Sequence, residues 1–435
     1  MMNLRKLLYA IAVAGITAFT LACDPARQAQ GTTSERISAL DADLNYCDSQ
    51  LHRTLAELAD STGTIDYTLS PRNILAGEHH WNLRRVGKAE WCGGFFPGIL
   101  WYDYEATADT AILSQARRFT QPLAFLAQTP AYDHDLGFLV ITSFLNGYRL
   151  TGDEAYKQVL LACADTLATL FNPHAGTILS WPRHVRDYGG HNTIMDNMIN
   201  LELLFWAADN GGADSLRQIA MSHADTTMAY HFHDEGIAYH VAVYDSIDGH
   251  FIRGCTHQGL ADTTMWARGQ SWAIYGYTMC YRYTHEQRYL SFAQKVADAY
   301  LKNLPADGVP FWDFNDPRIA TTTLTELTPS PSVAPRDASA ACVVASALIE
   351  LADYVDPVKA QTYLRVADLT LQTLRRPEWR GADSCPAFLL HSTGHHPAGS
   401  EVDASISYAD YYYIEALIRA RKHALESADK KKAEK

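Results

Sequence analysis

The chain has 435 residues, of which 47% are hydrophobic and 20% are charged. This balance is typical of a globular protein with a large core and excludes a protein of many membrane spans. The formal net charge of −13 argues against nucleic acid or an anionic membrane surface as a partner. An anionic ligand would therefore have to be attracted by local positive charge.

Residues 1–22 have the pattern of a secretory signal peptide. Arg5 and Lys6 precede an uncharged stretch, LLYAIAVAGITAFTLA, that leads to Cys23 and is short for a membrane-spanning helix. The TLAC ending is similar to a bacterial lipoprotein signal, so we expect Cys23 to be lipidated and to become the mature N-terminus. The sequence thus predicts an exported protein, a periplasmic or outer-membrane lipoprotein, whose membrane contact is only this anchor.

The rest of the chain is predicted to form one domain between two polar ends. Residues 23–35 are polar, as expected of a tether, and residues 426–435 are charged, as expected of a solvated tail. No segment with the composition of a linker interrupts residues 36–425. We therefore expect a single domain over that range.

A repeated pattern runs through this domain. Segments starting at Tyr104, Tyr148 and Tyr281 each contain Tyr-x-x-Thr, a polar turn, and a helical run with apolar residues at i, i+3, i+4 and i+7. Two further segments, starting at Asp209 and Tyr354, repeat the turn and the helix without the Thr. The helices that lead into these turns, such as IMDNMINLELLFWAA, are apolar nearly all round, which indicates burial on both sides. The pattern predicts an all-α toroid with an inner ring of buried helices and an outer ring of amphipathic ones.

Five helix pairs are visible in this pattern, and residues 38–61 could supply part of a sixth. The long stretches 172–192 and 236–265 do not follow the helical pattern, so we expect them to form loops over one mouth of the toroid. Loops held on a rigid scaffold often carry function.

Polar and aromatic groups precede or begin several of the inner helices. Asp and Asn at helix starts often only cap free backbone N–H groups, so each group alone has a purely structural explanation. If the helix starts converge at one end of the toroid, however, they predict a shared site there. The groups are Asp133, His134 and Asp135; His191, Asn192 and Asp196; His257, Gln258, Trp266, Arg268 and Trp272; and Arg336 and Asp337.

Asp196 is the most unusual member of this set, because it lies among apolar side chains in TIMDNMINLELLFW. A buried carboxylate without partners is costly and usually takes up a proton. Asp196 is therefore either a helix cap that faces water or a group whose proton is used.

Four tryptophans can supply flat surfaces to the same end of the toroid, where aromatic faces could stack on sugar rings. Packing in the core is the alternative for each of them. They are Trp91, Trp181, Trp266 and Trp272.

Metal binding has little support in the sequence. The His-x-His pair of His231 and His233, with His240 nearby, has no third ligand at a fixed spacing. The seven cysteines other than Cys23 form no C-x-x-C motif. We expect no metal and no other cofactor, and we expect most of these cysteines to be buried free thiols rather than disulfides.

The motifs HDLGF, MDNM, THQG and TMWARGQSWAIYG, in this order, resemble the unsaturated glucuronyl hydrolases of glycoside hydrolase family 88. The resemblance extends from about residue 39 to about residue 420. It implies an (α/α)₆ barrel, in agreement with the repeats. It also implies an enzyme without cofactors that removes the 4,5-unsaturated uronic acid from the non-reducing end of lyase-generated oligosaccharides, of the glycosaminoglycan type.

Two alternatives remain open. The unsaturated rhamnogalacturonyl hydrolases, which act on pectic fragments, carry a segment similar to WARGQ. A non-catalytic glycan-binding lipoprotein could use the same barrel mouth. Retention of both Asp135 and Asp196 argues against that second alternative, because a pure binder needs no proton donor among apolar residues.

The resemblance also implies roles for individual residues. Asp196 falls on the catalytic acid/base, and Asp135 falls on a second essential aspartate. The positions that fall on or near the substrate-binding residues of the family are Trp91, His134, Trp181, His240, Gln258, Trp266, Arg268 and Trp272.

The reaction implied by the resemblance makes a demand on Asp196, which must be protonated near neutral pH. Apolar neighbours and the charge of Asp135 should raise its pKa, while the helix N-terminus should lower it, and we expect the first two to prevail. Arg268 is expected to bind the substrate carboxylate in a bidentate manner, with Arg336 as the alternative.

Overall fold

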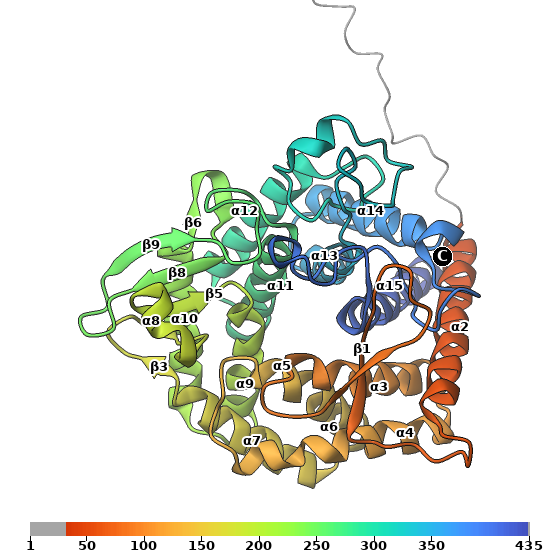
Figure 1. The fold of residues 1–435 in the computed structure, drawn as a ribbon, viewed down its shortest axis with the longest axis horizontal. Helices are drawn as coiled ribbons and strands as arrows, with labels where there is room; N and C mark the ends of the chain where they lie inside the picture. The colour runs from red at the N-terminus through yellow and green to blue at the C-terminus, as the bar shows by residue number, and fades with distance from the viewer. Residues whose placement is uncertain (1–31, 434–435) are drawn as a thin grey trace, which may run out of the picture.

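The computed structural model describes residues 32–433 and shows a ring of paired helices (Figure 1). The inner ring consists of α3 (Phe95–Thr107), α5 (Leu136–Val140) with α6 (Asn146–Thr151), α9 (Asn197–Asp209), α11 (Ala267–Thr284), α13 (Ala338–Ala352) and α15 (Ser407–Ala433). The outer ring consists of α4 (Thr110–Thr120), α7 (Glu154–Ala168), α10 (Asp214–Tyr230), α12 (Gln287–Asn303), α14 (Pro357–Leu374) and α2 (Thr33–Leu58).

The ring closes where α15 packs against both α3 and α2. Helix α2, from the beginning of the domain, is thus the outer partner of α15, from its end, and completes the sixth pair. The expected (α/α)₆ barrel is confirmed.

The Tyr-x-x-Thr motif builds the turns between inner and outer helices. After α3, the carbonyl of Tyr104 accepts the N–H of Ala108 at 2.8 Å, and the hydroxyl of Thr107 accepts the N–H of Asp109 at 3.2 Å. Asp109 then caps α4 by accepting the N–H of Ala111. The residue after each Thr has a left-handed backbone, with φ of 57° at Ala108, 67° at Gly152 and 56° at His285. Each repeat therefore encodes a helix stop, a reversal and a new helix start.

The two ends of the domain differ from the prediction. The signal peptide, Cys23 and most of the expected tether lie outside the described residues. Helix α2 already begins at Thr33, because Thr32 and Glu35 form a reciprocal capping box. Helix α15 continues to Ala433, so residues 426–433 are helical rather than a separate tail, as their content of good helix formers allows. Within residues 32–433 no helix is long and apolar enough to span a membrane.

Short strands occupy the long loops. They are β1 (Leu69–Ile74), β2 (Asn82–Arg85), β3 (Phe171–Asn172), β4 (Thr177–Ile178), β5 (His191–Ile194), β6 (Phe232–His233), β7 (Ile237–Ala238), β8 (Val241–Tyr244), β9 (Phe251–Cys255) and β10 (Ser405–Ile406). Two of the sheets have three antiparallel strands, in the orders β5-β8-β9 and β10-β1-β2. Strands β8 and β9, and the first two residues of β5, come from the two stretches expected to be loops. A further four-residue helix, α8 (Val185–Tyr188), lies in the first of them.

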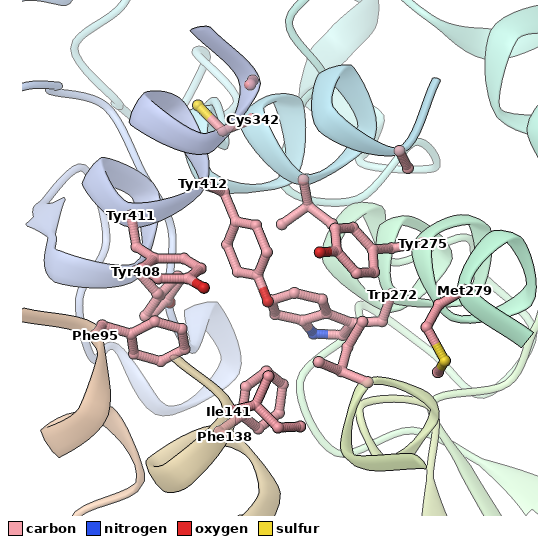
Figure 2. Packing of buried hydrophobic residues seen from close by; sticks show 14 of the residues in the cluster. Phe95, Phe138, Ile141, Trp272, Tyr275, Met279, Cys342, Tyr408, Tyr411 and Tyr412 are labelled. Carbon is pink, nitrogen blue, oxygen red and sulfur yellow. The ribbon is translucent and has the colours of Figure 1, made fainter. Parts of the chain in front are cut away.

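Aromatic side chains fill the centre of the barrel (Figure 2). Trp272 lies between Phe138 and Tyr412, with ring centroids 5.4 Å away in each case. The seven cysteines of the described residues are all buried and free, which confirms the expectation of free thiols: Cys47, Cys92, Cys163, Cys255, Cys280, Cys342 and Cys385.

Candidate active site

The first turns of the inner helices meet at one mouth of the barrel, and Asp135 and Asp196 occupy the positions before α5 and α9. Neither side chain caps its helix. Asp337, before α13, does so by accepting the N–H groups of Ser339 and Ala340. Asp196 is therefore not a helix cap that faces water, since its side chain caps nothing and the residue is only 8% exposed.

Each of the two aspartates faces a buried histidine. His240 Nε2 lies 3.6 Å from an oxygen of Asp196, and His134 Nε2 lies 3.5 Å from one of Asp135. Both histidines are buried, and this burial lowers their pKa, so they are neutral donors rather than cations.

The backbone fixes which nitrogen of His240 carries the proton. Its Nδ1 atom accepts the N–H of His257 at 3.2 Å and that of Gln258 at 3.0 Å. The proton of the neutral ring must then be on Nε2, which points at Asp196. The loop that carries THQG therefore orients a hydrogen-bond donor toward the carboxylate.

His134 is held from the neighbouring helix. The amide of Asn200, on α9, lies 3.0 Å from His134 Nδ1. A side chain at Gly137 would collide with Asn200, since its Cβ would lie 2.2 Å from the amide oxygen. Glycine thus allows α5 and α9 to approach closely beneath the two aspartates.

The protonation order of the two aspartates differs from the sequence-based expectation. Burial raises the pKa of Asp196, but the His240 N–H that faces it and the positive charge of Arg268 outweigh burial and leave that pKa below its usual value. Burial, and then the charge of Asp196, raises the pKa of Asp135 to about 8. The expectation of a raised pKa at Asp196 is wrong for this resting site: the proton of the pair resides on Asp135.

The four tryptophans differ in how far their side chains are buried. Trp181 is half-buried, lies 5.0 Å from the ring of His257, and is held at both backbone N–H and C=O by the Asn192 amide. Trp91 is also half-buried. The remaining two are buried: the Trp266 ring packs at a tilt against His240 with centroids 4.3 Å apart, and Trp272 is 0% exposed. The Trp272 ring is enclosed in this structure, and its role as a substrate-binding residue stays a prediction.

Arg268 is buried and already engaged. It donates to Asp337 at 3.0 Å and to the backbone carbonyls of Thr393 and Gly394. Gln258 Nε2 donates to the same Gly394 carbonyl at 3.1 Å. Both residues lie at the mouth as predicted, but they fasten a loop in this structure. That Arg268 is the main ligand of a substrate carboxylate remains a prediction. The present contacts of the Arg268 guanidinium do not favour this role.

The alternative cation, Arg336, is also engaged, with Asp307 and the carbonyl of Val309. Burial lowers its pKa.

Sequence reasoning missed the loop that Arg268 fastens. Residues 391–404 reach the mouth from the far end of the chain. There Glu401 accepts hydrogen bonds from Arg72 at 2.8 Å and from Asn73 at 2.6 Å. The Arg72 guanidinium lies 5.3 Å from the ring of Trp91, and its charge opposes part of the rise that burial causes in the pKa of Asp135. No motif connects these residues in the sequence, because their pairing depends on the closure of the barrel.

The histidines considered as metal ligands make different contacts in the structure. His240 belongs to the aspartate pair, and His231 is buried with its Nε2 atom near the carbonyl of His240. Among residues 32–433, the group of ligating side chains within reach of one another is Asp245, Asp248 and His250. This group lies in the turn between β8 and β9, where Asp248 and His250 are exposed. It is not part of the aspartate pair.

We predict that Arg268→Lys destabilises the protein by about 2 kcal/mol, within the range for buried hydrogen-bonded charge pairs. Lysine keeps the charge, but it cannot reach Asp337 and two separate carbonyls with a planar fork. Chemical denaturation of both proteins measures the change. Arg84→Lys, at an exposed side chain, is the control, and an equal effect of the two substitutions would contradict the special role of Arg268.

Paired carboxylates are the groups that glycoside hydrolases use for acid and base steps, and Trp181 offers a face for a sugar ring beside them. Fold and site together define a glycoside hydrolase built on a helical barrel.

Comparison with known proteins identifies the family. The chain is 38% identical over 423 residues to an unsaturated glucuronyl hydrolase of Formosa agariphila, covering 96% of this chain and 98% of that protein. It is 31% identical over 351 residues to an unsaturated chondroitin disaccharide hydrolase of Streptococcus agalactiae, covering 78% and 83%. No family model matches.

A crystal structure of an unsaturated glucuronyl hydrolase specific for heparin superposes with a TM-score of 0.78 at 35% identity, covering 88% of this chain and 97% of that one. The chain therefore belongs to the unsaturated glucuronyl hydrolases.

Proposed function

We propose that this hydrolase removes the unsaturated uronic acid from glycosaminoglycan-derived disaccharides, with Asp196 and Asp135 as its catalytic residues. The observation that carries the proposal is the buried pair of aspartates that face His240 and His134 at the barrel mouth. The names of its relatives, one acting on chondroitin disaccharides and one specific for heparin, support a substrate of this class.

The chemistry is hydration of the C4=C5 double bond, an enol ether to the ring oxygen. Asp196 gives its proton to C4, and the positive charge that develops at C5 is shared with the ring oxygen. Water adds to C5 and loses a proton to the same carboxylate, and the resulting hemiketal opens and expels the neighbouring sugar. In the resting site the proton of the pair is on Asp135. Asp135 therefore supplies the proton that Asp196 then delivers. A bound substrate brings its own carboxylate and displaces solvent, and both effects raise the pKa of Asp196.

The test is a comparison of unsaturated disaccharides prepared with lyases from chondroitin, hyaluronan, heparin and pectin. Turnover destroys the conjugated double bond, so loss of its ultraviolet absorbance gives the rate. We expect the highest kcat/KM on one of the three glycosaminoglycan products. Turnover of the pectic fragment alone would contradict the proposed substrate class.

We also propose that the enzyme is exported and anchored through Cys23, as the sequence of residues 1–23 supports. The anchored wild type should incorporate a palmitate analogue and fractionate with membranes. Cys23→Ala should lose the label and leave the membrane fraction, whereas the buried Cys163→Ala should keep both. Equal labelling of the wild type and Cys23→Ala would contradict the anchor.

A further inference from the structure

A cavity of about 360 Å³ lies between the inner helices below the two aspartates; its lining begins at Phe138 and Ile199, three residues after Asp135 and Asp196, and extends to Trp206. Five of the inner helices contribute to its walls, among them Tyr102 of α3, Tyr148 of α6, Trp206 of α9, Tyr283 of α11 and Glu415 of α15. Trp206 follows Asp196 by ten residues along α9, which is a distance of about 15 Å along a helix.

The aromatic core separates this cavity from the catalytic mouth. Phe138 and Tyr412 line the cavity, and both pack against the fully buried Trp272. Figure 2 shows these side chains meeting in the centre of the barrel. The cavity is therefore not an extension of the site that holds Asp135 and Asp196.

The charges around the cavity are paired. Arg282 donates to Glu202 and, at 2.9 Å, to Glu350. Arg419 donates to Glu350 at 2.7 Å and to Glu415 at 3.3 Å. Arg149, which also lines the cavity, donates to both oxygens of Glu105. Each guanidinium thus has carboxylate partners, so the cavity has no surplus of positive charge that would select an anion. Its ligand should carry no net charge.

Aromatic rings and a carboxylate face the remaining space. Trp206 and Tyr148 meet edge to face with centroids 5.5 Å apart, forming an aromatic corner. Glu202 uses one oxygen for Arg282 and Tyr283, and within residues 32–433 its other oxygen has no hydrogen-bond partner. A sugar ring fits this combination, because its C–H face packs on aromatic rings while its hydroxyls donate to carboxylates.

We propose that this cavity is a second binding site, for a neutral monosaccharide or disaccharide. Its volume lies in the range of small-molecule pockets, roughly 300–1,000 Å³. The site is distinct from the catalytic pair and does not depend on the substrate proposed above.

Calorimetric titration with cellobiose tests the proposal, because this saturated, uncharged disaccharide has no C4=C5 bond to hydrate. We expect saturable binding to the wild type and at least tenfold weaker binding to Trp206→Ala. The kcat/KM of Trp206→Ala on an unsaturated disaccharide should stay within about twofold of the wild type. Tyr230→Ala, which removes an aromatic ring that is 48% exposed elsewhere, should bind like the wild type.

Two further variants make the result decisive. Trp181→Ala alters the catalytic mouth and should leave cellobiose binding intact; loss of binding in this variant would place the sugar there and overturn the proposal. Glu202→Gln keeps the size of the side chain and should weaken binding at least threefold, so it replaces Trp206→Ala if that variant does not fold. Absence of binding to the wild type, or unchanged binding in both cavity variants, would also overturn it.

Discussion

Asp196→Asn is expected to lower kcat by about 10²- to 10⁴-fold, the usual scale for loss of a general acid/base, with KM changed only a few-fold. The amide has nearly the same shape as the carboxyl group but cannot deliver a proton to C4 or recover one from water. His240 Nε2, 3.6 Å away, can still donate to the amide oxygen, so the site should keep its form. Initial rates on the best unsaturated disaccharide measure the effect.

Asp209→Asn is the matched control for Asp196→Asn, because Asp209 lies at the other end of the same helix and pairs with Arg217 outside the site. It should retain near-normal kcat. If Asp196→Asn also turned over at near-normal rate, Asp196 would not be the proton donor, and its burial beside His240 would need another explanation.

The helical architecture could be predicted because its signals are local. Each of the five repeats contains the residues that end one helix and begin the next, three of them with Tyr-x-x-Thr, so five pairs were visible. The sixth was predicted only in part, since the partner of α2 is α15, at the opposite end of the domain. Short strands in the loops escaped detection because two- to six-residue segments carry too little periodicity.

The candidate site could be predicted in its residues but not in its electrostatics. Asp135 and Asp196 were found because polar groups recur at the starts of inner helices. The pKa of Asp196 depends on the direction of His240 Nε2, which two backbone N–H groups fix from a separate loop. The contacts of Arg268 likewise depend on carbonyls more than 120 residues away.

The pH profile should reveal which aspartate holds the proton. Because the pKa of Asp135 is raised to about 8, the pair keeps one proton below that pH and loses it above. The reaction needs this proton, so kcat/KM should fall as pH rises through about 8, and kcat/KM reports the free enzyme.

Asp135→Asn should both lower kcat/KM by at least about 10²-fold and move this falling limb toward acid. Without Asp135, the proton must sit on Asp196, whose own pKa the facing His240 N–H and the positive charge of Arg268 hold below its usual value. The variant should therefore be active only at acidic pH, shifted by at least about one unit, a change that loss of packing alone would not produce. Asp133→Asn, which alters the neighbouring carboxyl group that accepts the N–H of Asp135, is the control and should keep a limb near that of the wild type. A limb that stays near pH 8 in Asp135→Asn would mean that another group carries the proton, because an amide at position 135 cannot titrate.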